Sequence, residues 1–311
     1  MRFIALLAVS FWPLAASPST GLLSRGTNAA PHCTSGEKTE SWWVRPGIKP
    51  IPKLTSKLPA VSYQLPVDVA GTKRYRLRTI VLDAGHGGKD QGCVGPAGAR
   101  EAAVALKIVL ALGRQIAAEM PEVKVIYTRK TDVFIPLDER AGIANRHHAD
   151  LFVSVHCNAA GPSSHGTEVW TMGAHKTEAN LSVAKRENSV ILQEDDDYRT
   201  RYGGFDPRSP QSHILFSLFQ SAYLTNSLRL AQRIDRQFRT AVQRPSRGVK
   251  QAGFIVLWRS AMPSVLVEVG FLTNATEERF LNSGAGQTAM AGGIFRAFRE
   301  YKNELEGAAV E

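Results

Sequence analysis

Apolar and polar positions follow a regular pattern from about residue 78 onward, and they predict strands that alternate with helices. Short apolar runs predict the strands Thr79–Asp83, Val123–Thr128, Leu151–His156, Gly166–Met172 and Val265–Val269. Helical spacing predicts the helices Glu101–Ala118, Leu137–Asn145, a long helix from Ile214 to Phe238, and Ala289–Tyr301. The strands are apolar on both faces, so we expect an α/β fold in which a mixed, mostly parallel sheet is flanked by helices on both faces. A single domain of residues 76–305 accounts for this pattern, followed by a tail at 306–311.

The first 17 residues have the pattern of a secretory signal. Arg2 precedes an apolar run from Phe3 to Ala16, and the small residues Ser17 and Ser19 follow. The run is shorter than the about 20 residues that a transmembrane helix needs. We expect an exported protein, periplasmic or associated with the cell wall, with no stable membrane anchor after signal cleavage. A buried N-terminal helix is the alternative.

Residues 18–75 are rich in Ser, Thr, Pro and Lys, and their prolines interrupt any regular element. This segment is expected to be a linker or an irregular arm. Trp42 and Trp43 are its only strong apolar feature, and they predict either a piece that packs on the main domain or a docking spot.

Composition narrows the class of protein. Hydrophobic residues make up 43% of the 311 residues, which excludes a disordered chain. The net charge of +10 indicates a polyanionic partner, namely nucleic acid, anionic lipid or a cell-wall polymer. Export argues against nucleic acid. The odd number of cysteines (Cys33, Cys93 and Cys157) leaves at least one free thiol, and their spacing matches no zinc ribbon. Small buried residues or incidental thiols are the favoured interpretation, and a Cys33–Cys93 bridge is possible but unsupported.

Three polar side chains lie near the carboxyl ends of predicted strands. His86 follows the first strand within Asp83-Ala-Gly-His-Gly-Gly88, His156 ends the strand that begins at Leu151, and Glu268 lies near the end of Val265–Val269. Ligands bind at this edge of open α/β sheets. Glu101 lies on the apolar face of its helix, where a carboxylate needs a charged partner or a metal.

Two imidazoles and a carboxylate form the donor set of catalytic zinc sites, in which zinc lowers the pKa of its bound water to about 7. Glu268 is the candidate for general base and then acid, so the pattern predicts metal-assisted hydrolysis of an amide. Each residue alone has a structural explanation: a hydrogen-bonded core histidine, a helix cap at Glu101, or a buried ion pair at Glu268. Their joint placement favours a site.

Four motifs in order resemble the zinc-dependent N-acetylmuramoyl-L-alanine amidases. They are Thr79-Ile-Val-Leu-Asp-Ala-Gly-His-Gly-Gly88, Arg100-Glu101, Ser154-Val-His-Cys-Asn158 and Ser264-Val-Leu-Val-Glu-Val-Gly-Phe-Leu-Thr-Asn274. The resemblance covers about residues 78–305 and implies a sheet of about six strands. It also implies hydrolysis of the amide between N-acetylmuramic acid and L-alanine of peptidoglycan, in cell-wall remodelling or daughter-cell separation.

By position, the resemblance makes His86, Glu101 and His156 the Zn²⁺ ligands and Glu268 the catalytic glutamate. It also suggests Asn158 as an outer contact of the site. Arg140 and Asn145 match a family helix and are taken as structural.

A polar insert at about 173–211 departs from the basic pattern and is similar to one in the cell-division amidases. There, a helix covers the zinc until a partner protein removes it. Asn180–Ser189 could form such a helix, and Glu178 or Glu187 could reach the metal in place of water. The alternative is a surface helix that shapes the substrate groove.

Two other functions remain open on the sequence. One is a non-catalytic wall-binding scaffold, although a scaffold does not need all of His86, Glu101, His156 and Glu268. The other is a zinc peptidase that cuts the stem peptide, because the same metal chemistry serves either bond. Only the family resemblance favours the amidase.

Overall fold

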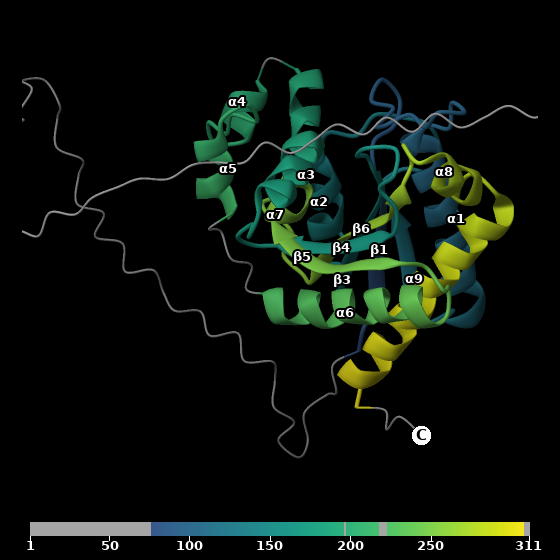
Figure 1. The fold of residues 1–311 in the computed structure, drawn as a ribbon. Coiled ribbons are helices and arrows are strands. Elements are labelled where there is room, and N and C mark those ends of the chain that lie inside the picture. Colours follow the sequence, from purple (N-terminus) through teal and green to yellow (C-terminus); the bar gives the residue numbers. More distant parts are fainter. Residues whose placement is uncertain (1–75, 196, 218–222, 308–311) are drawn as a thin grey trace, which may run out of the picture. The chain divides into compact units, whose positions relative to one another are not determined.

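The computed structural model describes residues 76–195, 197–217 and 223–307 (Figure 1). The expected signal at 1–17, the arm at 18–75 with Trp42 and Trp43, and Cys33 lie outside the described residues. No helix in the described ranges has both the length and the apolar character needed to cross a membrane.

One six-stranded sheet forms the centre of the described domain, in the order β2-β1-β3-β6-β4-β5. Its strands are β1 (Thr79–Ala84), β2 (Lys124–Tyr127), β3 (Leu151–Asn158), β4 (Thr167–Met172), β5 (Ser246–Ala252) and β6 (Ser264–Phe271). All neighbouring strands are parallel except β4 and β6, which are antiparallel. The expected α/β fold with a mixed, mostly parallel sheet of six strands is confirmed.

Helices cover both faces of the sheet (Figure 1). One face packs against α1 (Glu101–Glu119), α6 (Leu224–Thr240) and α9 (Gly284–Leu305), through a core that includes Val153 and Val267. The other face packs against α2 (Leu137–Arg146), α3 (Glu178–Asn188) and α7 (Ile255–Trp258), through a core that includes Phe152 and Trp170. Successive residues of a strand face opposite sides, so His156 and Glu268 share the face of Phe152 and Leu266.

Two elements differ from the predicted pattern. The sequence analysis missed β5, because Ser246–Ala252 is an edge strand in which only Ala252 is fully buried, so it has no apolar run. The single long helix from Ile214 to Phe238 was wrong: α5 (Pro210–Ser217) ends before α6 begins at Leu224. In one continuous helix, Ile214 would lie 17 residues before Ala231 and therefore about 100° around the helix axis from the buried face of α6. The side chain of Ile214 is accordingly exposed.

The insert is largely helical and lies along α2 and α7. It contains α3, the 3-10 helix η1 (Ser189–Gln193) and α4 (Tyr198–Arg201), and α5 begins at its end. The predicted helix at 180–189 corresponds to α3, which begins after Thr177, whose hydroxyl accepts a hydrogen bond from the backbone N–H of Asn180. The remaining helix, α8 (Ala275–Leu281), follows β6.

Candidate metal centre

His86 lies in a tight loop directly after β1. Its φ of 58° is in the left-handed region, which non-glycine residues rarely adopt, and Gly87 and Gly88 that follow also have positive φ. Two buried groups hold this conformation: Arg140 Nη2 donates to the carbonyl of His86 at 2.9 Å, and Asp90 Oδ2 lies 2.7 Å from His86 Nδ1. The Asp90 contact leaves Nε2 as the ring atom available to a ligand.

His156 projects from β3 over the backbone of Gly85. A Cβ at Gly85 would come within 2.4 Å of the His156 ring, so the ring fits only because residue 85 is a glycine. His156 Nδ1 lies 3.1 Å from Glu101 Oε1. Parallel pairing of β1 and β3 therefore brings the two imidazoles together, with ring centroids 4.8 Å apart.

Glu101 is the first residue of α1 and is fully buried. Its carboxylate accepts backbone N–H bonds from Cys93 at 2.9 Å and Cys157 at 2.8 Å. Burial alone would raise the pKa of Glu101, but the imidazoles of His86 and His156 outweigh burial and hold the pKa below its usual range. Glu101 is therefore an ionised carboxylate in a dry site.

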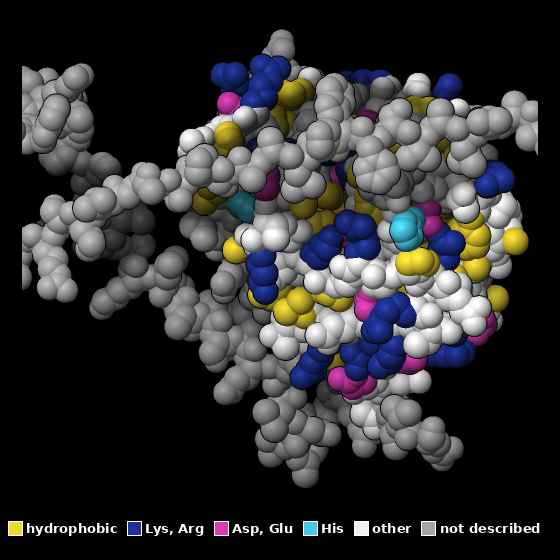
Figure 2. All heavy atoms as spheres, in the orientation of Figure 1, with side chains coloured by type: hydrophobic (Ala, Val, Ile, Leu, Met, Phe, Trp, Pro, Cys, Tyr) yellow, Lys and Arg dark blue, Asp and Glu magenta, His cyan; other side chains and the backbone are white. Residues whose placement is uncertain are grey.

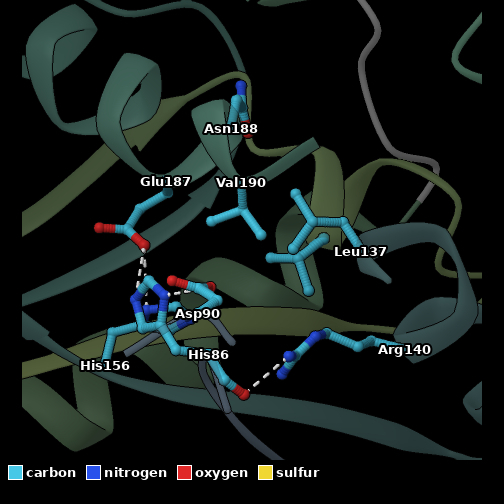
Figure 3. A pocket seen from close by; sticks show the side chains of 9 residues that line it. His86, Asp90, Leu137, Arg140, His156, Glu187, Asn188 and Val190 are labelled. Carbon is cyan, nitrogen blue, oxygen red and sulfur yellow. Dashed lines mark hydrogen bonds and ion pairs between the residues drawn. The ribbon is translucent and has the colours of Figure 1, made fainter. Parts of the chain in front are cut away.

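Glu187 of α3 completes this group (Figure 3). Its Oε2 lies 3.3 Å from His86 Nε2 and 3.1 Å from His156 Nδ1. One ligand atom from each of His86, Glu101, His156 and Glu187 lies within 4.8 Å of the others, and all four residues are buried. We refer to these four residues as the metal group.

Glu178, the other glutamate that the sequence analysis considered for the metal, is not at this site. Its side chain is 81% exposed and lies 3.6 Å from Lys185 Nζ. Glu178 and Glu187 are nine residues apart, about 2.5 helical turns, which places them on opposite sides of α3. Only Glu187 can face the sheet.

The metal group has the chemistry of a cation site. Among the described residues, His86 Nε2 and Glu187 Oε2 are buried without a hydrogen-bond partner. Burial lowers the pKa of His156, but the Glu187 and Glu101 carboxylates outweigh it and raise the pKa to about 9. The group therefore attracts positive charge strongly. Two imidazoles and two carboxylates suit a divalent cation such as zinc, so these residues could hold a metal.

Glu268 lies beside the metal group, on β6. It is the register partner of His156 across the β3–β6 pair, and it is fully buried. Oε1 lies 3.3 Å from Arg186 Nη2, whereas Oε2 has no hydrogen-bond partner among the described residues. Burial and then the negative charge of Glu187 raise the pKa of Glu268 well above its usual range. A raised pKa is typical of a carboxyl group that takes up and returns a proton during catalysis.

Arg186 of α3 links several of these polar groups. It contacts Glu187 Oε1 at 2.8 Å, and its Nη1 donates to Asn158 Oδ1 at 3.0 Å. The amide Nδ2 of Asn158 donates to Glu168 at 2.8 Å. Asn158, expected as an outer contact, thus reaches Glu187 and Glu268 through Arg186.

The sequence analysis missed Arg186, Glu168 and Asp90. Asp90 had a local signal, because it follows His86 by four residues in a glycine-rich loop. Arg186 and Glu168 had no signal in the sequence that could be recognised without knowledge of the fold. The two cysteines in the described part of the chain are free; Cys157 is buried and Cys93 is partly buried, as expected for small packed residues.

With α3 in place, little space remains at the metal group. The pocket in Figure 3 has a volume of about 10 Å³, which holds roughly one water. A second cavity of about 210 Å³ borders His86, Glu101 and Arg186. Typical ligand sites have about 300–1,000 Å³. Both volumes lie below this range.

Comparison with known proteins places this fold and site in one family. Residues 80–300 match the family described as N-acetylmuramoyl-L-alanine amidase. The amidase AmiA of Escherichia coli K12 is 33% identical over 236 residues, which cover 73% of this chain and 78% of AmiA. AmiC of Escherichia coli O6:H1 is 34% identical over 234 residues, which cover 73% of this chain and 54% of AmiC.

Solved structures agree. The N-acetylmuramoyl-L-alanine amidase of Clostridium difficile 630 superposes with a TM-score of 0.54 at 26% identity, over 73% of this chain and 97% of that one. The catalytic domain of CwlV from Bacillus (Paenibacillus) polymyxa superposes with a TM-score of 0.51 at 27% identity, over 72% of this chain and 97% of that domain.

An α/β sheet with a buried histidine–glutamate group at its carboxyl edge is typical of proteins that bind a metal ion at this edge. The chain belongs to the N-acetylmuramoyl-L-alanine amidase family. The family resemblance stated from the four motifs is confirmed.

Proposed function

We propose that this protein is a zinc-dependent amidase that hydrolyses the bond between N-acetylmuramic acid and L-alanine in peptidoglycan. The observation that carries the proposal is the buried convergence of His86, Glu101 and His156, with the carboxyl group of Glu268 on the neighbouring strand. A non-catalytic scaffold has no use for a proton-transfer group with a raised pKa beside such a site.

Each residue has a distinct role in this proposal. His86 Nε2, His156 Nδ1 and the Glu101 carboxylate would hold the zinc, which would supply Lewis-acid activation of water and of the scissile carbonyl. Asp90 orients the His86 ring. Glu268 takes a proton from the attacking water and delivers it to the leaving nitrogen. Burial raises the pKa of Glu268, which favours the acceptance of that proton.

Two variants test these roles separately. Introduced into a form of the protein that hydrolyses purified wall, Glu268→Gln should abolish that hydrolysis and keep zinc bound, because the Glu268 side chain is not in the metal group. His86→Ala should lose both. Mass analysis of the digest identifies the bond: free L-alanine amino ends on intact glycan support the amidase. Cuts within the stem peptide would support a zinc peptidase instead, and hydrolysis by Glu268→Gln would rule out its assigned role.

We also propose that α3 keeps the enzyme inactive until a partner protein withdraws it. Glu187 lies where water must bind, and Arg186 pairs with the carboxyl group that must accept a proton. Thus one turn of helix engages both the metal group and the proposed base. The small remaining volume at the site also supports the proposal.

The matched pair Glu187→Ala and Glu178→Ala tests the inactive state. Both residues are glutamates on α3, but only Glu187 touches the metal group. We expect Glu187→Ala to raise wall hydrolysis by the full chain alone at least about tenfold, the value of one lost charged contact. Glu178→Ala should match the wild type. Equal and measurable hydrolysis by the Glu187→Ala variant and the wild type would overturn the inactive state but not the amidase.

Export and wall association complete the proposal. They rest on the signal pattern of residues 1–17 and on a substrate that lies outside the cytoplasm. The net charge of +10 would help to retain the protein on an anionic wall, and this retention should weaken with salt. N-terminal sequencing of the exported protein tests cleavage near Ser17; an intact Met1 would contradict it.

A further inference from the structure

Two cations of β5 share one buried carboxylate at the edge of the sheet. Arg247 Nε lies 2.8 Å from Glu168 Oε1, and Lys250 Nζ lies 2.6 Å from the same oxygen. Glu168 is only 2% exposed, and its other oxygen accepts from Asn158. One negative charge therefore faces two positive charges, and this cluster carries a surplus positive charge.

The cluster is aligned with the proposed catalytic residues by the sheet itself. Glu168 is the register partner of Glu268 across the β4–β6 pair, and His156 is the partner of Glu268 on the other side. Directly opposite residues of neighbouring strands project from the same face. The side chains of His156, Glu268 and Glu168 thus stand in a row across three strands. On β5, Arg247 lies at a register shift and Lys250 is the partner of Trp170, and both side chains reach the Glu168 end of this row.

Arg247 is both fixed and accessible. Its guanidinium lies over the ring of Phe271, 5.1 Å from the centroid, and Phe271 ends the strand that carries Glu268. Its side chain is 47% exposed, and within the described ranges its two η nitrogens have no hydrogen-bond partner. Figure 2 shows Lys and Arg side chains gathered where Figure 1 draws β4 and β5. The planar guanidinium fork binds carboxylates through two parallel hydrogen bonds.

We propose that Arg247, positioned by Glu168 and assisted by Lys250, binds a carboxylate of the peptide portion of the substrate. The inference rests on the proposed amidase function and adds the side of the site on which the peptide lies. Sugar hydroxyls do not require a cation, whereas peptide carboxylates do. The peptide therefore runs from the metal group across β6 and β4 toward β5, and Arg247 is a specificity-determining residue.

The test compares two forms of one substrate. A muropeptide with free carboxylates and the same muropeptide with those groups converted to carboxamides are offered to whichever of the wild type and Glu187→Ala hydrolyses wall. We expect Arg247→Met to lower kcat/KM about 10- to 100-fold on the carboxylate form, mainly through KM, and to change the carboxamide form little. Arg247→Lys should recover part of the loss. Arg236→Met, which removes an exposed arginine on α6, is the control.

The outcomes separate the two proposals. An equal loss on both substrates would make Arg247 a structural residue and overturn the subsite. Equal hydrolysis of both substrates by the unmodified enzyme would also overturn it, while the amidase stands. If neither the wild type nor Glu187→Ala hydrolyses wall at all, the proposed function itself fails.

Discussion

Replacing Arg140 by alanine should destabilise the domain by about 3–5 kcal/mol, the typical cost of breaking a buried ion pair by removing one partner. Arg140 is 1% exposed and Asp83 is fully buried. Arg140 Nη1 lies 2.9 Å from Asp83 Oδ1 and 2.8 Å from the carbonyl of Ala84, and Nη2 donates to the carbonyl of His86. Without the guanidinium, Asp83 retains only hydroxyl donors, from Thr128 and Ser154.

Arg146 provides the control on the same helix. It pairs with Glu139, but the two side chains are 59% and 43% exposed, so Arg146→Ala should cost less than about 1 kcal/mol. Urea denaturation followed by circular dichroism measures both variants. A free energy of unfolding that falls by the same small amount in both would refute the assignment of Arg140 as the support of the His86 loop.

The pH dependence of the same variant gives a second check. Burial raises the pKa of Asp83, but Arg140 and the hydroxyl donors Ser154 and Thr128 together outweigh burial, so the net pKa is lowered. A carboxyl group with a lowered folded pKa stabilises the fold above its unfolded pKa, and this contribution is lost on acidification. The difference between wild type and Arg140→Ala should therefore shrink below about pH 4. A constant difference from pH 7 to pH 3 would contradict the ion pair as its cause.

Three further perturbations concern the metal group. Gly85→Ala should abolish zinc binding because the added Cβ would meet the His156 ring. Gly161→Ala, which has open space around it, should bind zinc as the wild type does. Zinc titration against a chelating dye measures the affinity of both variants. Asp90→Asn should weaken zinc binding about 10- to 100-fold in the same titration, through the lost orientation of His86, and an unchanged affinity would remove Asp90 from the site. Removal of metal by a chelator should lower the Tm and abolish wall hydrolysis, and added zinc should restore both. Hydrolysis that persists in the metal-free protein would exclude a metal enzyme.

Much of the fold followed from sequence because the central strands are buried on both faces. Leu151–Asn158 and Ser264–Phe271 are buried at every position, so their apolar runs are unambiguous. Glu101 could be identified from the sequence because a carboxylate is unusual on the apolar face of a helix. β5 was missed because an edge strand has a single buried face at most, and its Arg247 and Lys250 look like ordinary surface cations.

The contacts of α3 were beyond sequence reasoning for a different reason. Arg186 and Glu268 lie 82 residues apart, and Glu187 meets His86 only because the insert folds back over the carboxyl edge of the sheet. Neither the residue types nor their spacing in the sequence predicts that the insert folds back over this edge of the sheet. Helical periodicity shows that Glu178 and Glu187 lie on opposite sides of α3. Which of the two faces the metal group is known only once the buried side of α3 is known.

The pairing of Arg186 with Glu187 explains how the proposed inactive state can be reversible. Glu187 alone would be a single buried charge, which is costly to move in either direction. Arg186 contacts both Glu187 and Glu268, so α3 enters and leaves with one positive and one negative charge. When the pair withdraws, the net charge of the site does not change: the metal group loses one carboxylate, and Glu268 loses its guanidinium. In this proposal the same movement would free both the position for water and the proposed base Glu268, so a partner would have to displace only one helix to activate both.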